Sequence, residues 1–399
     1  MIAAWGFVAL AAAAASGVPL PSGTELHVRL NTKLASNASK AKEPFEAMVI
    51  VPVISGGQIV VPGGAKLDGV VHDIRAAAAG QQALLDLRFT DLVIGQAKLP
   101  LAAQVSDVDN AREIIDSSGK ILGIVTSETI SGRIDQGIAK VQEKYSGLAE
   151  VLQAAKGAFV KAAAGDIDFE PGVELTLKLT APLKIPQEAI SKIEGPKLAP
   201  VTDEAALVAM VNGQPFQTMA EQPRKPSDVT NVMYIGTEAQ LTAAFQAAGW
   251  STAAALDAKS KMETARAIIE DRGYKEAPVS ILLLEDRPPD LVFQKQNDTF
   301  AQRHHLRIWR RPVTFDGKPV WVCSATHDTG IDFSEQNRTF IHKIDPDIDK
   351  ERAKVVNDLL LTGQVKSLEL VERPQVPKHS QNATGDNLDT DAAMAVVIF

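Results

Sequence analysis

The chain of 399 residues contains a single cysteine, Cys323, which excludes an internal disulfide and any zinc site built from several cysteines. It also lacks an excess of basic charge. The formal net charge is -8, so there is no global positive field for nucleic acid, and any anion site must be a local group of cations. Nucleic acid is therefore excluded as an expected partner.

Motifs that would name an enzyme are also missing. The sequence has no Gly-x-Ser-x-Gly elbow, phosphate loop or dinucleotide fingerprint, and no His-x-x-x-His spacing for a metal. The sequence consequently predicts no particular cofactor or metal. It also leaves the oligomeric state open.

Charged side chains are absent from residues 1–15, which are nearly all apolar. Ala13 and Ala15 have the small-residue spacing of a cleavage site, so we predict a signal peptide over 1–17 and export to the periplasm or cell envelope. The segment lacks Lys and Arg, which leaves an uncleaved anchor as an alternative. No later stretch reaches about eighteen uncharged apolar residues.

The sequence after residue 17 is rich in strand patterns. Alternating or continuous apolar runs are separated by glycine pairs such as Gly56-Gly57 and Gly63-Gly64, and closely spaced hairpins of this kind favour a small barrel or sandwich. We predict an all-β, barrel-like domain over 18–104 and 166–194. The expected strands are 24–30, 45–53, 58–61, 65–74, 84–92, 97–101 and 173–179.

Between the two parts of the barrel the apolar period changes. Apolar residues recur at three- and four-residue steps, which predicts a helical insertion over 105–165. The strand at 173–179 then repeats the pattern of 24–30. This repetition predicts that a last strand returns to the barrel.

Several of these pieces resemble the β-barrel of TrbI-type conjugation scaffold proteins. The resemblance implies a barrel with a helical insertion before its final strand, and envelope or secretion-system proteins as partners. It is carried by Pro21-Ser22-Gly23-Thr24-Glu25-Leu26, Ile59-Val60-Val61-Pro62-Gly63-Gly64-Ala65 with Gly69, Gly80-Gln81 and Pro171-Gly172-Val173-Glu174-Leu175.

A proline-rich segment predicts a linker over 195–230, with a short helix at 204–211. After it, Thr237 and Gln240 form a capping box that opens a helix. Helices are also expected at 257–271 and 346–362. With strands at 231–235, 279–284, 291–294, 304–310, 365–371 and 393–399, residues 231–399 form an α+β domain, and the chain is multidomain.

The stretch 303–309 concentrates side chains that bind anions or protons. Period two places Arg303, His305, Arg307 and Trp309 on one face and His304 on the other. Two guanidiniums that flank an imidazole are able to hold a phosphate or an anionic lipid headgroup. The alternative is that His304 is a core histidine and the arginines pair with acids on an exposed face. The ligand-binding candidates are Arg303, His304, Arg307, Trp309 and Asp347.

A second group of polar residues is found at 341–351. Asp345 is placed to cap the next helix, and Asp347 complements its positive end, so capping alone accounts for both acids. The alternative hypothesis makes His305, His342 and Asp345 a catalytic acid-base group. His327 and Asp328 are predicted as a turn pair before Gly330.

The second half also resembles the LssY C-terminal domain, which implies a link to secretion but no defined activity. The motifs that carry the resemblance are Asn231-Val232-Met233-Tyr234-Ile235-Gly236, Ala247-Ala248-Gly249-Trp250, Ala277-Pro278-Val279-Ser280, Asp290-Leu291-Val292-Phe293-Gln294-Lys295, Arg303-His304-His305-Leu306-Arg307-Ile308-Trp309 and His342-Lys343-Ile344-Asp345-Pro346-Asp347-Ile348-Asp349-Lys350-Glu351-Arg352.

These observations indicate two functions. The first is an exported, noncatalytic binding or scaffold module of the cell envelope, secretion-associated, with an anion-binding LssY-like domain. The alternative is a hydrolase of an envelope lipid phosphate or ester, which requires His305, His342 and a carboxylate in one cleft. Whether those side chains share a cleft distinguishes the two.

Overall fold

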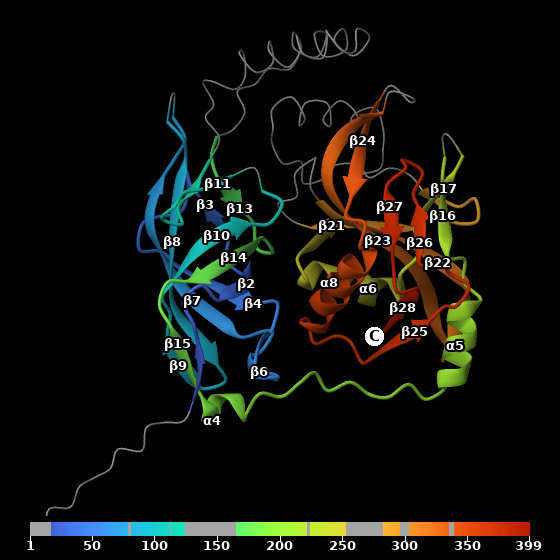
Figure 1. Cartoon of the computed structure of the whole chain (residues 1–399), viewed down its shortest axis with the longest axis horizontal. Helices are drawn as coiled ribbons and strands as arrows, with labels where there is room; N and C mark the ends of the chain where they lie inside the picture. Colours follow the sequence, from blue (N-terminus) through green and yellow to red (C-terminus); the bar gives the residue numbers. More distant parts are fainter. Residues whose placement is uncertain are drawn as a thin grey trace, which may run out of the picture.

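The computed structural model describes residues 17–78, 81–111, 113–123, 165–221, 224–252, 282–295, 303–334 and 339–399. The chain forms two β-rich halves that lie side by side along the longest axis of the molecule (Figure 1). Nine of the fifteen strands described in the first half belong to a barrel-like sheet, and the other six form three two-stranded sheets. The second half is a mixed sheet with helices, so the predicted order of an all-β part followed by an α+β part is confirmed.

The strands of the first half bury the apolar residues that alternate with polar ones in the sequence. In β2 (Glu25–Leu30), Leu26, Val28 and Leu30 are buried while Glu25 is exposed, because successive side chains point to opposite faces. The other strands of this half are β1 (Gly17–Leu20), β3 (Leu34–Ala35), β4 (Pro44–Val49), β5 (Val53–Ser55), β6 (Gln58–Val61), β7 (Lys66–Arg75), β8 (Leu84–Ile94), β9 (Ala97–Pro100), β10 (Ala103–Val108), β11 (Ile114–Ile115), β12 (Ile121–Leu122), β13 (Asp168–Phe169), β14 (Glu174–Leu179) and β15 (Leu183–Pro186).

The main sheet of this half has the order β10-β14-β2-β4-β7-β8-β12-β11. Because β10 also lies against β8, the sheet is nearly closed around an apolar core. Strand β14 pairs with β2, with Leu177 opposite Leu26, and it separates β2 from β10. The predicted return of a late strand to the barrel is confirmed.

The helical insertion predicted over 105–165 is wrong for its first residues, which form β10, β11 and β12. Val105 and Val108 are three apart, a spacing that suggested a helix. Instead, the β10–β14 ladder shifts register between Val105 and Asp107, and both valines are buried. A bulge of this kind changes which residues share a face, so a strand imitates a helical period. Residues 124–164 of the expected insertion lie outside the described residues.

A short helix, α4 (Gln187–Ile190), ends the first half, and residues 191–203 then run without helix or strand to the second half (Figure 1). The short helix predicted next is confirmed as α5 (Glu204–Asn212). The rest of the predicted linker contains two unexpected strands, β16 (Gln217–Ala220) and β17 (Pro226–Val229). They form a small sheet with β20 (Leu282–Leu283). Pro226 starts β17, where a missing backbone N–H is tolerated.

The main sheet of the second half has the order β19-β21-β22-β23-β18-β28-β25. Strands β18 and β28 are parallel, and the other pairs are antiparallel. The elements of this half are β18 (Val232–Ile235), α6 (Glu238–Ala247), β19 (Trp250–Thr252), β21 (Leu291–Lys295), β22 (Arg303–Phe315), β23 (Lys318–Ser334), β24 (Thr339–Ile344), α8 (Ile348–Leu360), β25 (Ser367–Glu372), β26 (His379–Gln381), β27 (Asn387–Asp389) and β28 (Ala393–Ile398).

Both faces of this sheet are covered. Helices α6 and α8 pack on one face through residues such as Phe245 and Leu359, and α5 packs on the other through Leu207. The capping box at the start of α6 is present, as predicted. The helix expected at 257–271 lies outside the described residues.

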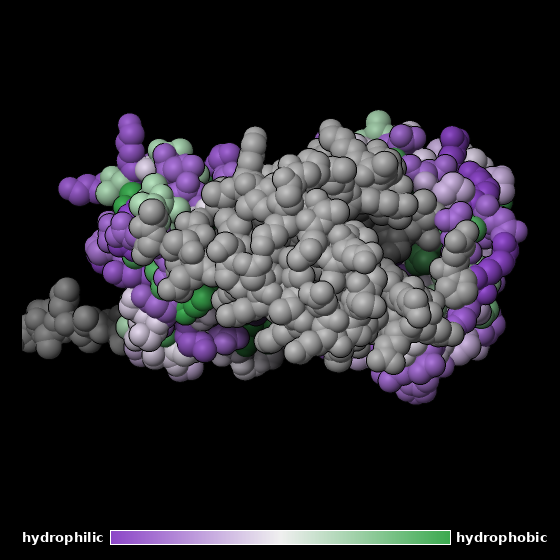
Figure 2. All heavy atoms as spheres, turned by 90° about the horizontal axis from the view of Figure 1, so that it is seen from above, coloured by the Kyte–Doolittle hydropathy of each residue, from purple (hydrophilic) through white to green (hydrophobic). Residues whose placement is uncertain are grey.

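Hydrophilic residues dominate the described surface seen from above (Figure 2). Within the described ranges, no helix has the length and apolar character needed to cross a bilayer.

Candidate functional site

Five charged residues meet where the two halves touch. Arg29 of β2 and Glu174 of β14 come from the barrel, whereas Lys295 of β21, Lys354 and Asp358 come from the second half. We call these residues the charge cluster. Their side chains are between 1% and 20% exposed, so the cluster is largely removed from water.

The cluster is held by contacts that cross between the halves. Lys295 Nζ lies 2.7 Å from Glu174 Oε1 and 3.1 Å from Asp358 Oδ2. Arg29 Nη2 lies 2.9 Å from Glu174 Oε1 and also donates to Asp358. The indole Nε1 of Trp250 donates to Asp358 Oδ2 at 3.0 Å. Three cations thus surround two carboxylates.

The pKa values agree with this arrangement. Burial by itself would raise the pKa of Glu174, but Lys295 and Lys354 hold that pKa well below its usual range. The pKa of Asp358 is lowered in the same way, against its own burial, by the same two lysines. Both carboxylates are therefore ionised at neutral pH. A buried pair of this kind costs desolvation energy, so removing one partner leaves the other charge uncompensated.

The halves also approach backbone to backbone beside the cluster. A Cβ atom added to Gly249 would lie 2.9 Å from the Cα atom of Gly172 in the barrel. Gly249 has φ of 78°, in the left-handed region that favours glycine. A larger residue at Gly249 would therefore force the two halves apart.

Two histidines extend the contact between the halves. His304 lies between Glu351 of α8, with Nδ1 2.7 Å from Oε2, and Asp109 of the barrel, with Nε2 3.1 Å from Oδ2. Its ring stacks on that of His327, with centroids 4.0 Å apart. His327 Nε2 in turn lies 3.1 Å from Asn110 Oδ1. We call His304 and His327 the histidine pair.

The two rings have opposite pKa shifts. Burial would lower the pKa of His304, but the carboxylates of Glu351 and Asp109 raise it to about 10. Burial and the neighbouring charge of His304 lower the pKa of His327. His304 is thus a cation at neutral pH, and it is closer to the predicted core histidine than to a ligand-binding group.

The opposite face of β22 carries the predicted arginines, and the predicted division of faces is confirmed. Arg303 Nε donates to Asp328 Oδ2 at 2.9 Å, and Arg307 Nη1 donates to Asp228 Oδ2 at 3.3 Å. Between them, His305 Nε2 lies 3.0 Å from Thr326 Oγ1. Arg303 is 2% exposed and Arg307 4% exposed, so both guanidiniums face internal acids.

Burial dominates the electrostatics on this face. It raises the pKa of Asp228 and of Asp328, although Arg307 and Arg303, respectively, oppose the change. It also lowers the pKa of Arg307. The layer beneath β22 therefore consists of paired buried charges, namely Arg303, Arg307, Asp228 and Asp328. Its arrangement favours the alternative in which the arginines pair with acids, with the difference that the pairs are buried.

The other predicted ligand and capping residues have structural contacts. Trp309 is buried, and its Nε1 donates to the carbonyl oxygen of Arg287 at 3.0 Å. Asp347 is the N-cap residue of α8 but makes no side-chain cap bond. Asp345 Oδ1 instead accepts the N–H of Asp347 at 3.0 Å, one step before the helix. The prediction that Asp345 caps the helix is therefore wrong, because its side chain accepts the N–H of the N-cap residue and none from the first turn of α8.

The proposed catalytic residues are not brought together by the backbone. His305 pairs with Thr326 on β23, whereas His342 on β24 pairs with Ile331 of the same strand. Five residues along a strand amount to roughly 16 Å. The side chain of His342 lies outside the description. The backbone of Asp345 lies beside that of His327, because its N–H donates to the carbonyl oxygen of His327.

The prediction of a turn at His327 and Asp328 is wrong. Both residues lie inside β23, where they pair with His304 and Arg303. The acids that neutralise the site were also missed, and only those on α8 left a signal in the sequence. Glu351 and Asp358 are seven residues apart, so they share a helical face with the apolar Val355. Charged residues on an apolar face indicate buried ion pairs.

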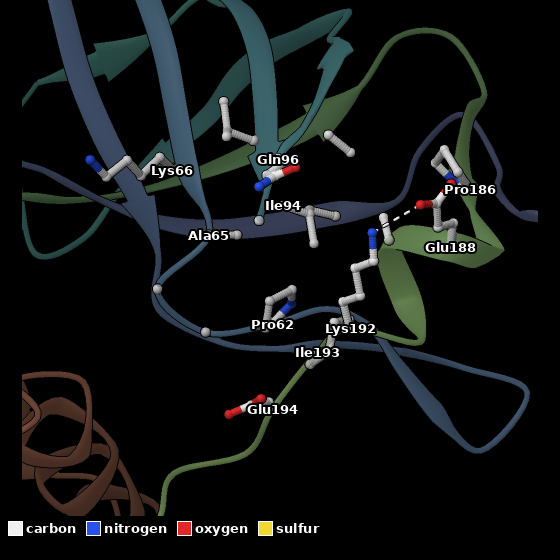
Figure 3. Close-up of a pocket in the computed structure, with 16 residues that line it drawn as sticks. Pro62, Ala65, Lys66, Ile94, Gln96, Pro186, Glu188, Lys192, Ile193 and Glu194 are labelled. Carbon is white, nitrogen blue, oxygen red and sulfur yellow. Dashed lines mark hydrogen bonds and ion pairs between the residues drawn. The ribbon is translucent and has the colours of Figure 1, made fainter.

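Among the described residues, no group of three or more His, Cys, Asp or Glu side chains is arranged to hold a metal ion. A cavity of about 600 Å³ lies away from the charge cluster, at the end of the barrel where α4 begins. Figure 3 shows Lys192 at this cavity, where it is paired with Glu188 at 2.9 Å. The cavity contains none of the predicted site residues.

Comparison with known proteins gives three findings. No curated protein matches the chain. Among solved structures, the chain is similar to ComB10 of the Com type IV secretion system of Helicobacter pylori, with 12% identity and a TM-score of 0.24, over 43% of this chain and 93% of that chain. Residues 211–394, which include the histidine pair and the buried arginines, match the family described as LssY C-terminus, and this part of the chain is an LssY C-terminal domain.

Proposed function

We propose that the protein is an exported, noncatalytic scaffold module of the cell envelope, in which the barrel and the LssY C-terminal domain act as one rigid body. The supporting observation is that the groups suited to chemistry are used to hold the protein together. His304 joins α8 to the barrel, and Arg303 and Arg307 are paired with internal acids. A scaffold needs such fixed geometry, whereas a hydrolase needs groups that are accessible to substrate.

The hydrolase hypothesis has less support. His304 and His305 lie on opposite faces of β22, and the residues of β23 that pair with His305 and His342 are five positions apart. The anion-binding hypothesis is weakened as well, since an external phosphate would have to displace Asp328 or Asp228. Partners among envelope or secretion-system proteins remain part of the proposal, because the barrel motifs and the LssY name both suggest them.

The rigid-body part is tested by distance measurement. The native Cys323 is buried, so spin labels can be attached selectively at Lys98→Cys on β9 and Leu370→Cys on β25. We expect a single narrow distance distribution between the labels. The same labels with Asp358→Ala should give a broad one, because the charge cluster then loses an acid. A broad distribution in the unsubstituted chain would contradict the proposal.

The compartment and the absence of an anion site are tested separately. We expect a C-terminally tagged chain in the envelope or periplasmic fraction; full-length protein in the cytoplasm would contradict export. A thermal-shift screen with phosphate and headgroup analogues should show no stabilisation. A shift that disappears in both Arg307→Lys and His305→Ala would instead restore the anion-binding hypothesis.

A further inference from the structure

The hairpin of β5 and β6 is an exposed apolar element on an otherwise charged protein. No charged side chain occurs from residue 47 to residue 65, although 23% of the chain is charged. Val51 is 46% exposed, Ile54 65% and Ile59 40%. Ile54 and Ile59 are cross-strand partners, so their side chains lie on the same face.

The hairpin is anchored while its tip stays exposed. Val60 and Val61 are fully buried in the barrel core, and the carbonyl oxygen of Ile50 accepts a hydrogen bond from Asn357 of α8. The base of the hairpin is therefore fixed to both halves. Exposed strands of soluble proteins usually carry charge or proline against unwanted pairing. In this hairpin the turn between the strands is Gly56-Gly57, with no charged residue beside it. Proline occurs only at the base, as Pro52 before β5 and Pro62 after β6, so the tip carries neither protection.

The same end of the barrel receives the N-terminal segment. Strand β6 contacts α4, and α4 contacts β1. Gly17, the first residue of β1, pairs with Pro186, which lines the cavity shared with Pro62–Lys66 just after β6 (Figure 3). Residues 1–15, which are uncharged and nearly all apolar, therefore precede a strand that is connected to the hairpin through α4, and in the uncleaved form they add an apolar segment to this end of the barrel.

We propose that this end of the barrel docks on a lipid surface, with Ile54 and Ile59 inserted among the acyl chains. A protein partner would need hydrogen-bonding groups, about one per 100–200 Å² of interface, and Ser55 and Gln58 are the only polar side chains from 47 to 65. The nearby Lys192 is paired with Glu188, and Lys197 is paired with Glu194. Apolar burial rather than charge then drives docking.

The full chain is tested with vesicles of phosphatidylcholine alone. An environment-sensitive dye is attached at Gln58→Cys, since the buried Cys323 does not react. We expect a blue-shifted emission with vesicles that is unchanged by salt, because no charged group at the hairpin is involved. The same dye at Leu370→Cys, on β25, should not respond.

The matched variants separate docking from misfolding. Ile54→Thr with Ile59→Thr keeps β-branched residues in both strands and removes apolar area, so we expect at least a tenfold loss of vesicle binding at the dye with unchanged circular dichroism. Leu370→Thr removes an equally exposed leucine and should have no effect.

Three results would overturn the inference: vesicle binding without a response at residue 58, binding that survives both threonine substitutions, or a concentration-dependent shift without vesicles. The last result would assign the hairpin to contact between copies of the chain. None of them bears on the noncatalytic role proposed above, which fails or stands on its own tests.

Discussion

Strands β2 and β22 have the same alternation of charged and apolar residues but different surroundings. In β2, the apolar residues face the barrel core and Glu25 faces water; Arg29 is buried only because the second half covers it. In β22, every residue from 303 to 309 is buried, and the two arginines lie inside the second half itself. Alternation thus fixes which side chains share a face, while the cover on that face comes from distant elements.

This difference predicts unequal costs for breaking buried charges in the two places. The charge cluster has three cations for two acids and joins two halves, whereas the layer beneath β22 lies within the second half, where Arg303 contacts Asp328 and Arg307 contacts Asp228. Loss of an acid should therefore be more damaging at the interface than within the sheet.

The largest effect is expected for Asp358→Ala. It removes an acid that contacts Arg29, Lys295 and Trp250, so two buried cations lose a partner at once. We expect the free energy of unfolding to fall by about 3–5 kcal/mol. Urea denaturation measures it. A fall below about 1 kcal/mol would show that water reaches the interface and screens the charges.

A smaller effect is expected for Asp328→Asn. The substitution keeps the shape of the side chain but leaves Arg303 without the carboxylate on its Nε. We expect a loss of about 1.5–3 kcal/mol, typical of a hydrogen bond to a charged group. The distance distribution between labels on the two halves should not change. If it broadens, the layer under β22 and the interface are coupled, and the two sets of buried charges do not act separately.

The third prediction concerns pH. The pKa of His304 is raised to about 10 from an ordinary 6.5, so the bound proton stabilises the folded state. This stabilisation is complete below about pH 6.5 and is lost as pH rises towards 10. The melting temperature of the wild type should therefore fall over that window more than that of His304→Gln. Parallel curves would show that the proton on His304 does not hold Glu351 and Asp109.

Much of the fold was predictable from short-range patterns. The barrel strands, the capping box of α6 and the two faces of β22 all derive from residues close together in sequence. The partners of the predicted site were not predictable. Arg307 meets Asp228 across 79 positions, and His304 meets Asp109 across 195. No local period encodes such pairs, so a site of buried charges had the same pattern as an exposed one.

The position of β28 in its sheet has a consequence for how the chain folds. This strand lies between β18 and β25, and it is the parallel partner of β18, which it follows by about 160 residues. The sheet is therefore incomplete on the β25 side of β18 until β28 has been synthesised. Contacts that join such distant segments form slowly. Slow folding of this kind would keep the chain unfolded for longer after synthesis, which suits the proposed export of an unfolded chain.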